Sequence, residues 1–91
     1  MVLFHCLLEL RMPYVSGLKG RRSALASIKA KLKSHNVSML DLSGEYVKEA
    51  AIAFAFLSPD EKEGVRYLEK IEKRLQPFLC EYRYDLSYEV L

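Results

Sequence analysis

The sequence contains few of the residues that make linkers, membrane spans or leader peptides. Four glycines and three prolines in 91 residues are too few for a flexible linker, and no segment combines low hydrophobicity with high charge. No apolar run approaches the ~20 residues of a membrane-spanning helix. The apolar start of the chain lacks a basic leader, and Glu9 and Arg11 stand where a signal peptide would have small residues. These absences predict a single domain over residues 1–91 that is cytoplasmic and has no membrane partner.

Residues that carry catalysis or bind metals are equally scarce. The two cysteines, Cys6 and Cys80, lie far apart, match no metal-ligand spacing and fall in apolar segments, where a reduced thiol behaves as a small hydrophobe. The two histidines, His5 and His35, complete no Ser-His-Asp or Cys-His arrangement. The segment GLKGRR has neither the spacing of a phosphate-binding loop nor a strand running directly into it. We therefore expect no catalytic residues, no metal and no cofactor, in a protein that is not an enzyme.

Acidic residues are almost absent from the first part of the chain. Residues 1–40 contain seven basic residues and one acid, Glu9, which gives a net charge of +6, whereas residues 41–91 carry −4. The segment 16–35, SGLKGRRSALASIKAKLKSH, contains six Lys or Arg residues and neither Asp nor Glu. This asymmetry points to an anionic partner and says little about the fold.

Two periods of hydrophobicity follow one another along the sequence. Alternation of apolar residues, typical of half-buried strands, predicts strands at 2–12, 37–42, 49–57 and 78–91. Helical spacing of apolar residues predicts helices from about Leu18 to Ser34 and from Ser58 to about Gln76.

The second helix has strong boundary signals. Ser58 is expected to cap it, Pro59 suits its first position, and Glu61 completes a capping box. Pro77 is expected to end it, because proline cannot donate the next helical hydrogen bond.

The order of elements is strand, helix, strand, strand, helix, strand. This order predicts an α+β domain with the ferredoxin-like βαββαβ arrangement. Its four-stranded antiparallel sheet would have the strand order 4-1-3-2, with two helices on one face, because the crossovers are right-handed.

The strand phases predict which face of the sheet is buried. Phe4, Phe54 and Phe56 share the face assigned to the core, so we do not expect the exposed aromatic platform of an RRM, which has the same topology. A phosphate-handling enzyme of the acylphosphatase type is also disfavoured, because the loop MPYVSGLKG contains no Arg. The opposite face would be smooth and apolar, a feature of interfaces, and the long last strand could also add to a partner's edge. These features predict a homodimer. The apolar face carries Leu3, Leu7, Ala51, Ala53, Ala55 and Leu57.

The two predicted helices differ in where their charges lie. The second has acids at its start and bases at its end, as the helix dipole favours. The first carries Lys19, Arg21 and Arg22 at its start, where free N–H groups already attract anions, and Arg21 points near its apolar stripe. Lys29 and Lys33 lie with Lys19 and Arg22 along one flank of that stripe. The candidate anion-binding residues are Lys19, Arg21, Arg22, Lys29 and Lys33; the alternative is a solvated face whose charges pair with acids elsewhere in the chain.

The segment SGLKGRRSALASIKAKLKSHNVSMLDL also resembles the signature of the YlxP-like family of small bacterial proteins, a domain of unknown function. Leu18, Lys19, Arg21 and Arg22 match its first part, and Asn36, Val37 and Ser38 match its second. Gly17 and Gly20 replace the Ser and Glu usual in that family. The resemblance implies a ferredoxin-like fold, no established activity, and a connection to RNA or the ribosome through neighbouring genes for transcription and translation factors.

Two functions are therefore expected. The first is non-enzymatic association with RNA or the ribosome through the basic first helix. The alternative is a homodimeric protein–protein interaction module without a nucleic-acid ligand, in which the basic helix provides solubility.

Overall fold

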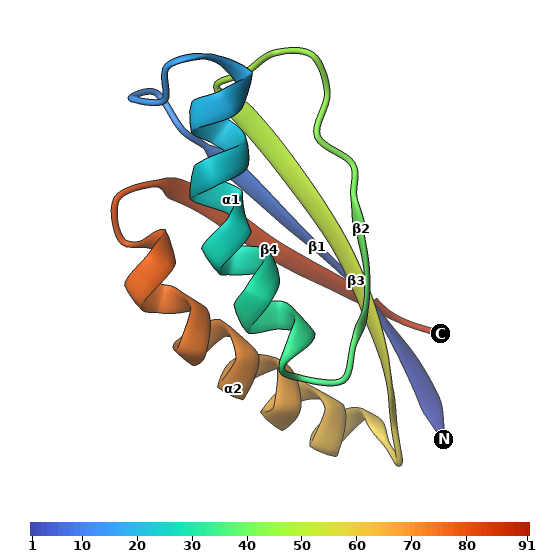
Figure 1. Ribbon diagram of the computed structural model, residues 1–91. Coiled ribbons are helices and arrows are strands. Elements are labelled where there is room, and N and C mark those ends of the chain that lie inside the picture. Colours follow the sequence, from blue (N-terminus) through green and yellow to red (C-terminus); the bar gives the residue numbers. More distant parts are fainter.

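A computed structural model describes residues 1–91 and contains the predicted βαββαβ order (Figure 1). The elements are β1 (Val2–Arg11), α1 (Gly17–Lys33), β2 (Ser38–Asp41), β3 (Glu49–Ser58), α2 (Glu61–Leu79) and β4 (Arg83–Val90). Neither helix has the length and apolar character of a membrane-spanning segment.

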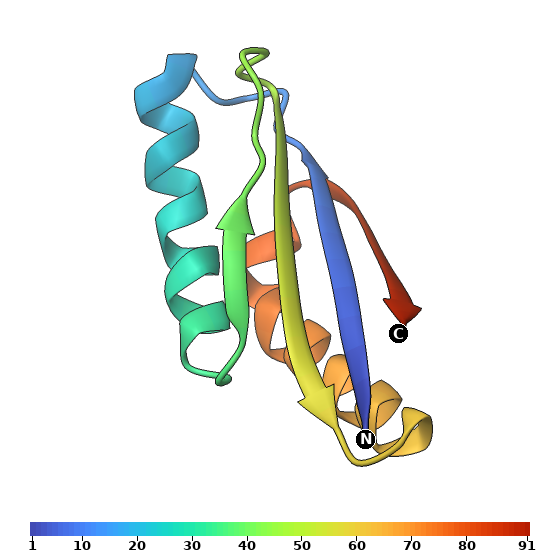
Figure 2. The same cartoon turned by 90° about the vertical axis from the view of Figure 1, so that its right-hand side faces the viewer.

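The four strands form one antiparallel sheet in the order β2-β3-β1-β4, which is the predicted order read from the other edge. Both helices cover the same face, and the opposite face carries no second layer (Figure 2). The long β1 and β3 lie at the centre, where Phe4 is opposite Phe56 and Leu8 is opposite Ile52. The ferredoxin-like prediction is confirmed.

The core lies between the helices and the central strands. The side chains of Phe4, Phe54 and Phe56 are 0%, 1% and 6% exposed. Their burial confirms the predicted strand phases and removes the aromatic residues that an RRM-type platform would need on the open face.

The start of α2 differs from the prediction. Asp60, and not Ser58, is the N-cap, and its side chain accepts a 2.8 Å hydrogen bond from the backbone N–H of Glu63. Ser58 is instead the last residue of β3, is buried, and donates its hydroxyl to the carbonyl of Asp60. The capping signal was therefore present but shifted by two residues, because the strand continues to Ser58.

The end of α2 also differs from the prediction. The helix continues through Pro77 to Leu79, and the N–H of Cys80 bonds to the carbonyl of Gln76. Pro77 leaves the carbonyl of Lys73 without its helical donor, but the added turn carries Leu79 into the core, where it is 1% exposed. As a result β4 begins only at Arg83, later than the predicted residue 78.

Candidate anion-binding site on the first helix

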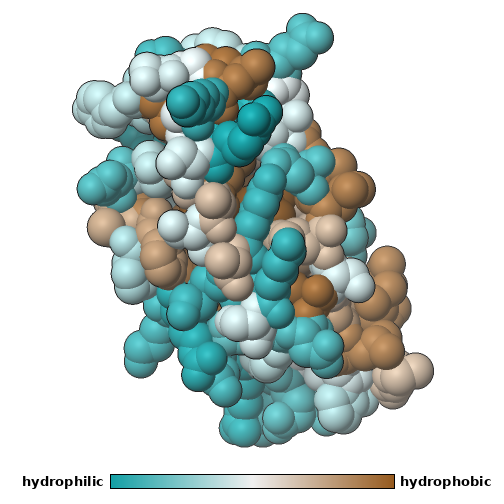
Figure 3. Space-filling model, viewed as in Figure 1, coloured by the Kyte–Doolittle hydropathy of each residue, from teal (hydrophilic) through white to brown (hydrophobic).

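The start of α1 is electropositive. Its first turn contains no acidic residue, and the side chain of its N-cap, Ser16, makes no capping hydrogen bond. The positive potential of the free N–H groups therefore adds to that of the surrounding cations. Hydrophilic side chains cover much of the helix-bearing side of the molecule (Figure 3).

Arg21 does not belong to this accessible surface, and its predicted role requires correction. It is 9% exposed, and its Nη1 donates to the carbonyl oxygens of Gly44 (2.8 Å), Tyr46 (3.0 Å) and Glu49 (3.0 Å). Its position on the apolar stripe directs the guanidinium inward, toward the segment that leads into β3. Arg21 therefore ties the beginning of α1 to this segment and is not available to a phosphate.

Lys29 has a partner in its own chain. Its ammonium pairs with the carboxylate of Asp41 at the end of β2, 2.5 Å away. Burial alone would raise the pKa of Asp41, but the hydrogen bonds from Lys29 and Ser43 and the Lys29 charge outweigh burial and lower the pKa to about 2. For Lys29 the alternative interpretation is therefore correct: its charge is neutralised by an acid of the same chain.

The other three candidates remain accessible. Lys19, Arg22 and Lys33 are exposed, and neither of the two ion pairs in the structure includes them. Their side chains are therefore accessible from solvent and are not paired with an acid of the same chain.

Three further cations, outside the predicted set, lie near the buried His35. His35 is 4% exposed, and its pKa is lowered by burial and then by the charges of Arg74, Lys70 and Lys31. Lys31, Lys70 and Arg74 therefore lie near His35, where α1 ends beside α2, on the opposite flank of α1 from Lys33. The missed signal was the spacing of Lys70 and Arg74, which places both on one side of α2.

The open face of the sheet carries the predicted apolar residues. Leu57 is 64% and Leu3 36% exposed, and both sit opposite each other in the β1–β3 register. Leu40 of β2, which was not part of the prediction, extends this surface and is 62% exposed.

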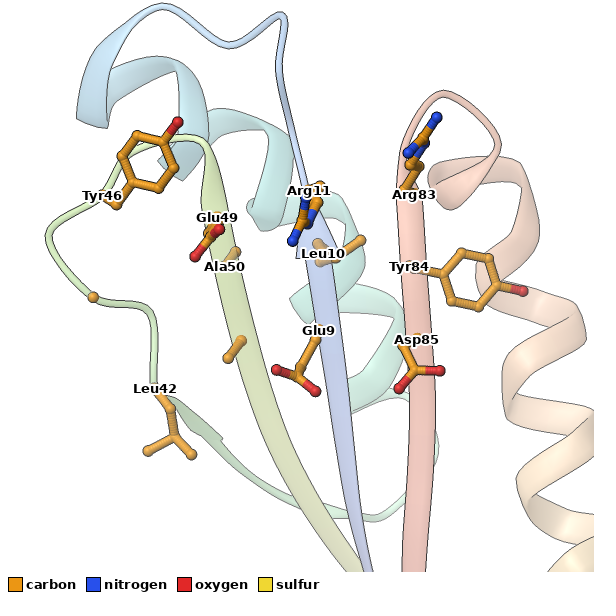
Figure 4. A pocket seen from close by; sticks show the side chains of 12 residues that line it. Glu9, Leu10, Arg11, Leu42, Tyr46, Glu49, Ala50, Arg83, Tyr84 and Asp85 are labelled. Atoms are coloured by element: carbon orange, nitrogen blue, oxygen red, sulfur yellow. The ribbon is translucent and has the colours of Figure 1, made fainter.

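A shallow pocket of about 550 Å³ lies at one end of this face, beside the segment Leu42–Tyr46 (Figure 4). Like charges face one another across its floor: Arg11 is opposite Arg83, and Glu9 is opposite Asp85. Such cross-strand pairs are destabilising, and Arg83 extends away from Arg11 in Figure 4. No ion pair within 4.0 Å relieves them in the single chain.

The cysteines and the possible metal ligands form no further site. The thiol of Cys6 is buried, and burial raises its pKa to about 12, so it stays protonated. Cys80 is exposed in the turn before β4 and not in a strand as predicted. No group of three potential metal ligands is present.

Comparisons with known proteins identify a family and a fold. A family model described as "Protein of unknown function (DUF503)" matches residues 3–83. This match is compatible with the YlxP-like resemblance. No curated protein matches the sequence.

Among solved structures, the designed protein Foldit4 has a TM-score of 0.55 at 11% identity and covers 97% of this chain and 94% of its own. The designed ferredoxin-fold protein LFR1 1 has a TM-score of 0.53 at 8% identity, with coverage of 99% and 85%. A VAO-type flavoprotein from Myceliophthora thermophila reaches 0.63 at 14% identity, and the chain spans 16% of its length. At these identities the similarity concerns the fold alone.

Proposed function

Since the chain belongs to the DUF503 family of unknown function, we propose from its surface that it is a non-enzymatic protein that associates with RNA or the ribosome in the cytoplasm. The site is the face of α1 that bears Lys19, Arg22 and Lys33. The single observation behind the proposal is that these cations are exposed and lack carboxylate partners.

The charge pattern supports a polyanion and not a small anion. The exposed cations of α1 extend from its first turn to its last turn. A helix of 17 residues is about 25 Å long, several times the spacing of phosphates along a nucleic-acid strand. Each contact would release condensed counterions, so binding would depend steeply on salt and weakly on sequence.

The test measures the affinity for a labelled single-stranded RNA as a function of salt concentration. The variant Lys19→Ala/Arg22→Ala/Lys33→Ala should weaken binding and reduce the slope of log K against log salt by about 2, because each lost phosphate contact removes ~0.7. Arg21 is left intact, because its replacement would disturb the fold.

A matched control removes the same charge elsewhere. Arg11→Ala/Lys62→Ala/Arg66→Ala lowers the net charge equally, but these residues lie on β1 and at the beginning of α2. The control should keep most of the slope. Equal losses in both triple variants would show that only net charge matters, and an absence of RNA binding at low salt would refute the proposal.

A second candidate function rests on the open face of the sheet. The exposed side chains of Leu3, Leu40 and Leu57 form an apolar surface of a kind that marks protein interfaces. In that case the chain is an interaction module without a nucleic-acid ligand. Partners would remain bound after nuclease treatment and would be lost in the variant Ala53→Glu, which places a charge in the middle of this face.

A further inference from the structure

The edge strand β4 is long, in contrast to the edge strand β2. β2 has only four residues, whereas β4 has eight and contains no proline or lysine. β4 lies at the edge of the sheet, and Figure 2 shows no other segment beyond it. A long edge strand without proline is a site for pairing with another strand, and its charged residues, Arg83, Asp85 and Glu89, restrict which strand fits.

The main chain of β4 offers a regular set of unpaired groups at this edge. Leu3 and Leu91 exchange two hydrogen bonds, of 3.0 and 2.7 Å. Because such pairs alternate along an antiparallel ladder, the odd-numbered residues of β4 bond to β1. The N–H and C=O groups of Tyr84, Leu86 and Tyr88 therefore point away from the sheet.

The core-side residues of β4 are also incompletely covered. On β1 the corresponding side chains of Phe4, Cys6 and Leu8 are fully buried. On β4 Tyr88 is 45% exposed although its ring stacks on Phe4, and Tyr84 and Leu86 are only partly buried. A strand added beside β4 would complete this part of the core.

The side chains of β4 are complementary to a second copy of β4. In an antiparallel pairing centred on Leu86, Arg83 lies opposite the partner's Glu89, and Tyr84 lies opposite the partner's Tyr88. Two-fold symmetry repeats each contact. Arg83 and Glu89 occupy non-hydrogen-bonded positions, where opposed Cα atoms are only about 4.5 Å apart. Within its own chain Arg83 faces Arg11 and has no acidic partner.

Neighbouring registers are unfavourable. A pairing centred on Ser87 places Asp85 opposite the partner's Glu89, and one centred on Asp85 places two copies of this acid opposite each other. Like charges directly opposite across strands are destabilising. The charges of β4 therefore favour the pairing centred on Leu86 over these two neighbours.

From these observations we propose that two copies of the chain associate through β4, centred on Leu86, and join their sheets into one continuous eight-stranded sheet. About six main-chain hydrogen bonds and two Arg83–Glu89 pairs hold the copies together. The open faces remain accessible, and the inference does not depend on RNA binding by α1.

The first test is the mass in solution by sedimentation velocity over a micromolar concentration range. The wild type should form a particle of twice the 10.5 kDa chain. Arg83→Glu and Glu89→Arg, measured separately, should each raise the dissociation constant about tenfold, because each creates two like-charge contacts. Arg83→Glu also removes the repulsion with Arg11, so the monomer should keep its circular-dichroism spectrum.

Charge reversal makes the test specific. An equimolar mixture of the two single variants should form a heterodimer, and the double variant Arg83→Glu/Glu89→Arg should regain the homodimer. Ala53→Glu, on the open face, should leave the dimer unchanged. A monomer at all concentrations would overturn the proposal. So would a dimer that is indifferent to both reversals, or one that Ala53→Glu dissociates.

Amide hydrogen exchange provides an independent readout. The amides of Asp85 and Ser87 should be protected at every protein concentration, because they bond to β1. The amides of Leu86 and Tyr88 should become protected only as the dimer forms. Protection of Leu86 and Tyr88 that does not change between the monomeric and the dimeric range contradicts pairing at this edge.

Discussion

The two helices lie on the same face of the sheet, but different interactions hold their first turns. In α2 the fixing contacts are local: Asp60 caps the helix, and Glu61 and Glu63 favour its dipole. In α1 the first turn has neither a capping side chain nor an acid, and Arg21 reaches more than twenty residues along the chain to three carbonyls.

This difference explains why α1 can carry exposed cations at its start. A helix that depends on its cap and dipole loses ~0.3–1 kcal/mol for each base placed in its first turn. In α1 the bonds of the buried Arg21 offset this cost, because hydrogen bonds from a charged donor are worth ~1.5–3 kcal/mol. The N–H groups and the exposed Lys19 and Arg22 then remain free for a ligand.

The largest difference in stability between the two helices is expected when a glycine in each is replaced by alanine. A Cβ added at Gly64 of α2 would lie closer than 3.0 Å to three atoms of the buried Phe4 ring. Gly64→Ala should therefore destabilise the fold by about 3 kcal/mol. At Gly20 of α1 the nearest atom is 3.6 Å away, so Gly20→Ala should stabilise by ~0.5–1 kcal/mol. Urea unfolding of both variants checks the opposite signs, and two effects of the same sign would contradict this packing.

The next largest effect concerns the long-range anchor of α1. Arg21→Met keeps the aliphatic stem but leaves the carbonyls of Gly44 and Glu49 without this donor, whereas the carbonyl of Tyr46 keeps its bond from the N–H of Glu49. The variant should cost about 2 kcal/mol. Arg22→Met, at the adjacent exposed position, should change stability by less than ~0.5 kcal/mol. Equal unfolding midpoints of the two variants in urea would show that Arg21 anchors nothing.

The capping residues should differ by a smaller amount. Asp60→Ala removes the 2.8 Å bond to the N–H of Glu63 and should cost about 1 kcal/mol. Ser16→Ala should have almost no effect, because the Ser16 side chain makes no capping bond. Thermal unfolding should therefore separate the two midpoints by ~4–8 °C, and a larger loss in Ser16→Ala would reverse the assignment.

The smallest effect is the pH dependence of the second long-range contact of α1. The pKa of Asp41 is about 2 in the folded protein and ~3.9 unfolded, so its contribution is present above pH ~3.9 and is lost as the pH falls toward 2. Because its side chain is 34% exposed, solvent screening keeps the contribution below ~1 kcal/mol.

Asp41→Asn should accordingly lower the free energy of unfolding at pH 7 but not at pH 2. Asp85→Asn is a control, since this acid faces another acid, Glu9, and has no ion pair. Urea titrations at both pH values measure the difference. If Asp41→Asn lowers the free energy of unfolding at pH 2 as much as at pH 7, the ionisation of Asp41 does not contribute to stability.

Much of the fold was predictable because periodicity is a local property. Alternation placed Phe4 and Phe54 on the buried face and Leu57 on the open face, and helical spacing placed both helices. The boundaries of α2 were wrong for a physical reason. The last turn buries Leu79, and this tertiary gain outweighs the penalty of Pro77.

The candidate site was only partly predictable. The sequence identified the basic helix, and it placed Arg21 near the apolar stripe. It could not show that three carbonyls would meet the Arg21 guanidinium, because Gly44, Tyr46 and Glu49 are distant in sequence. The pairing of Lys29 with Asp41 was unpredictable for the same reason, because folding brings these two residues together from different elements.

By itself the sequence determined the order of the elements, the faces of the strands and the concentration of positive charge on one helix, since these follow from spacing along the chain. Only the tertiary structure decided which cations face solvent, which are bound by the protein's own oxygens, and which strand remains unpaired at an edge. Those outcomes depend on groups that folding brings together from distant segments, where burial and hydrogen bonding, and not residue type, fix the role of a charge.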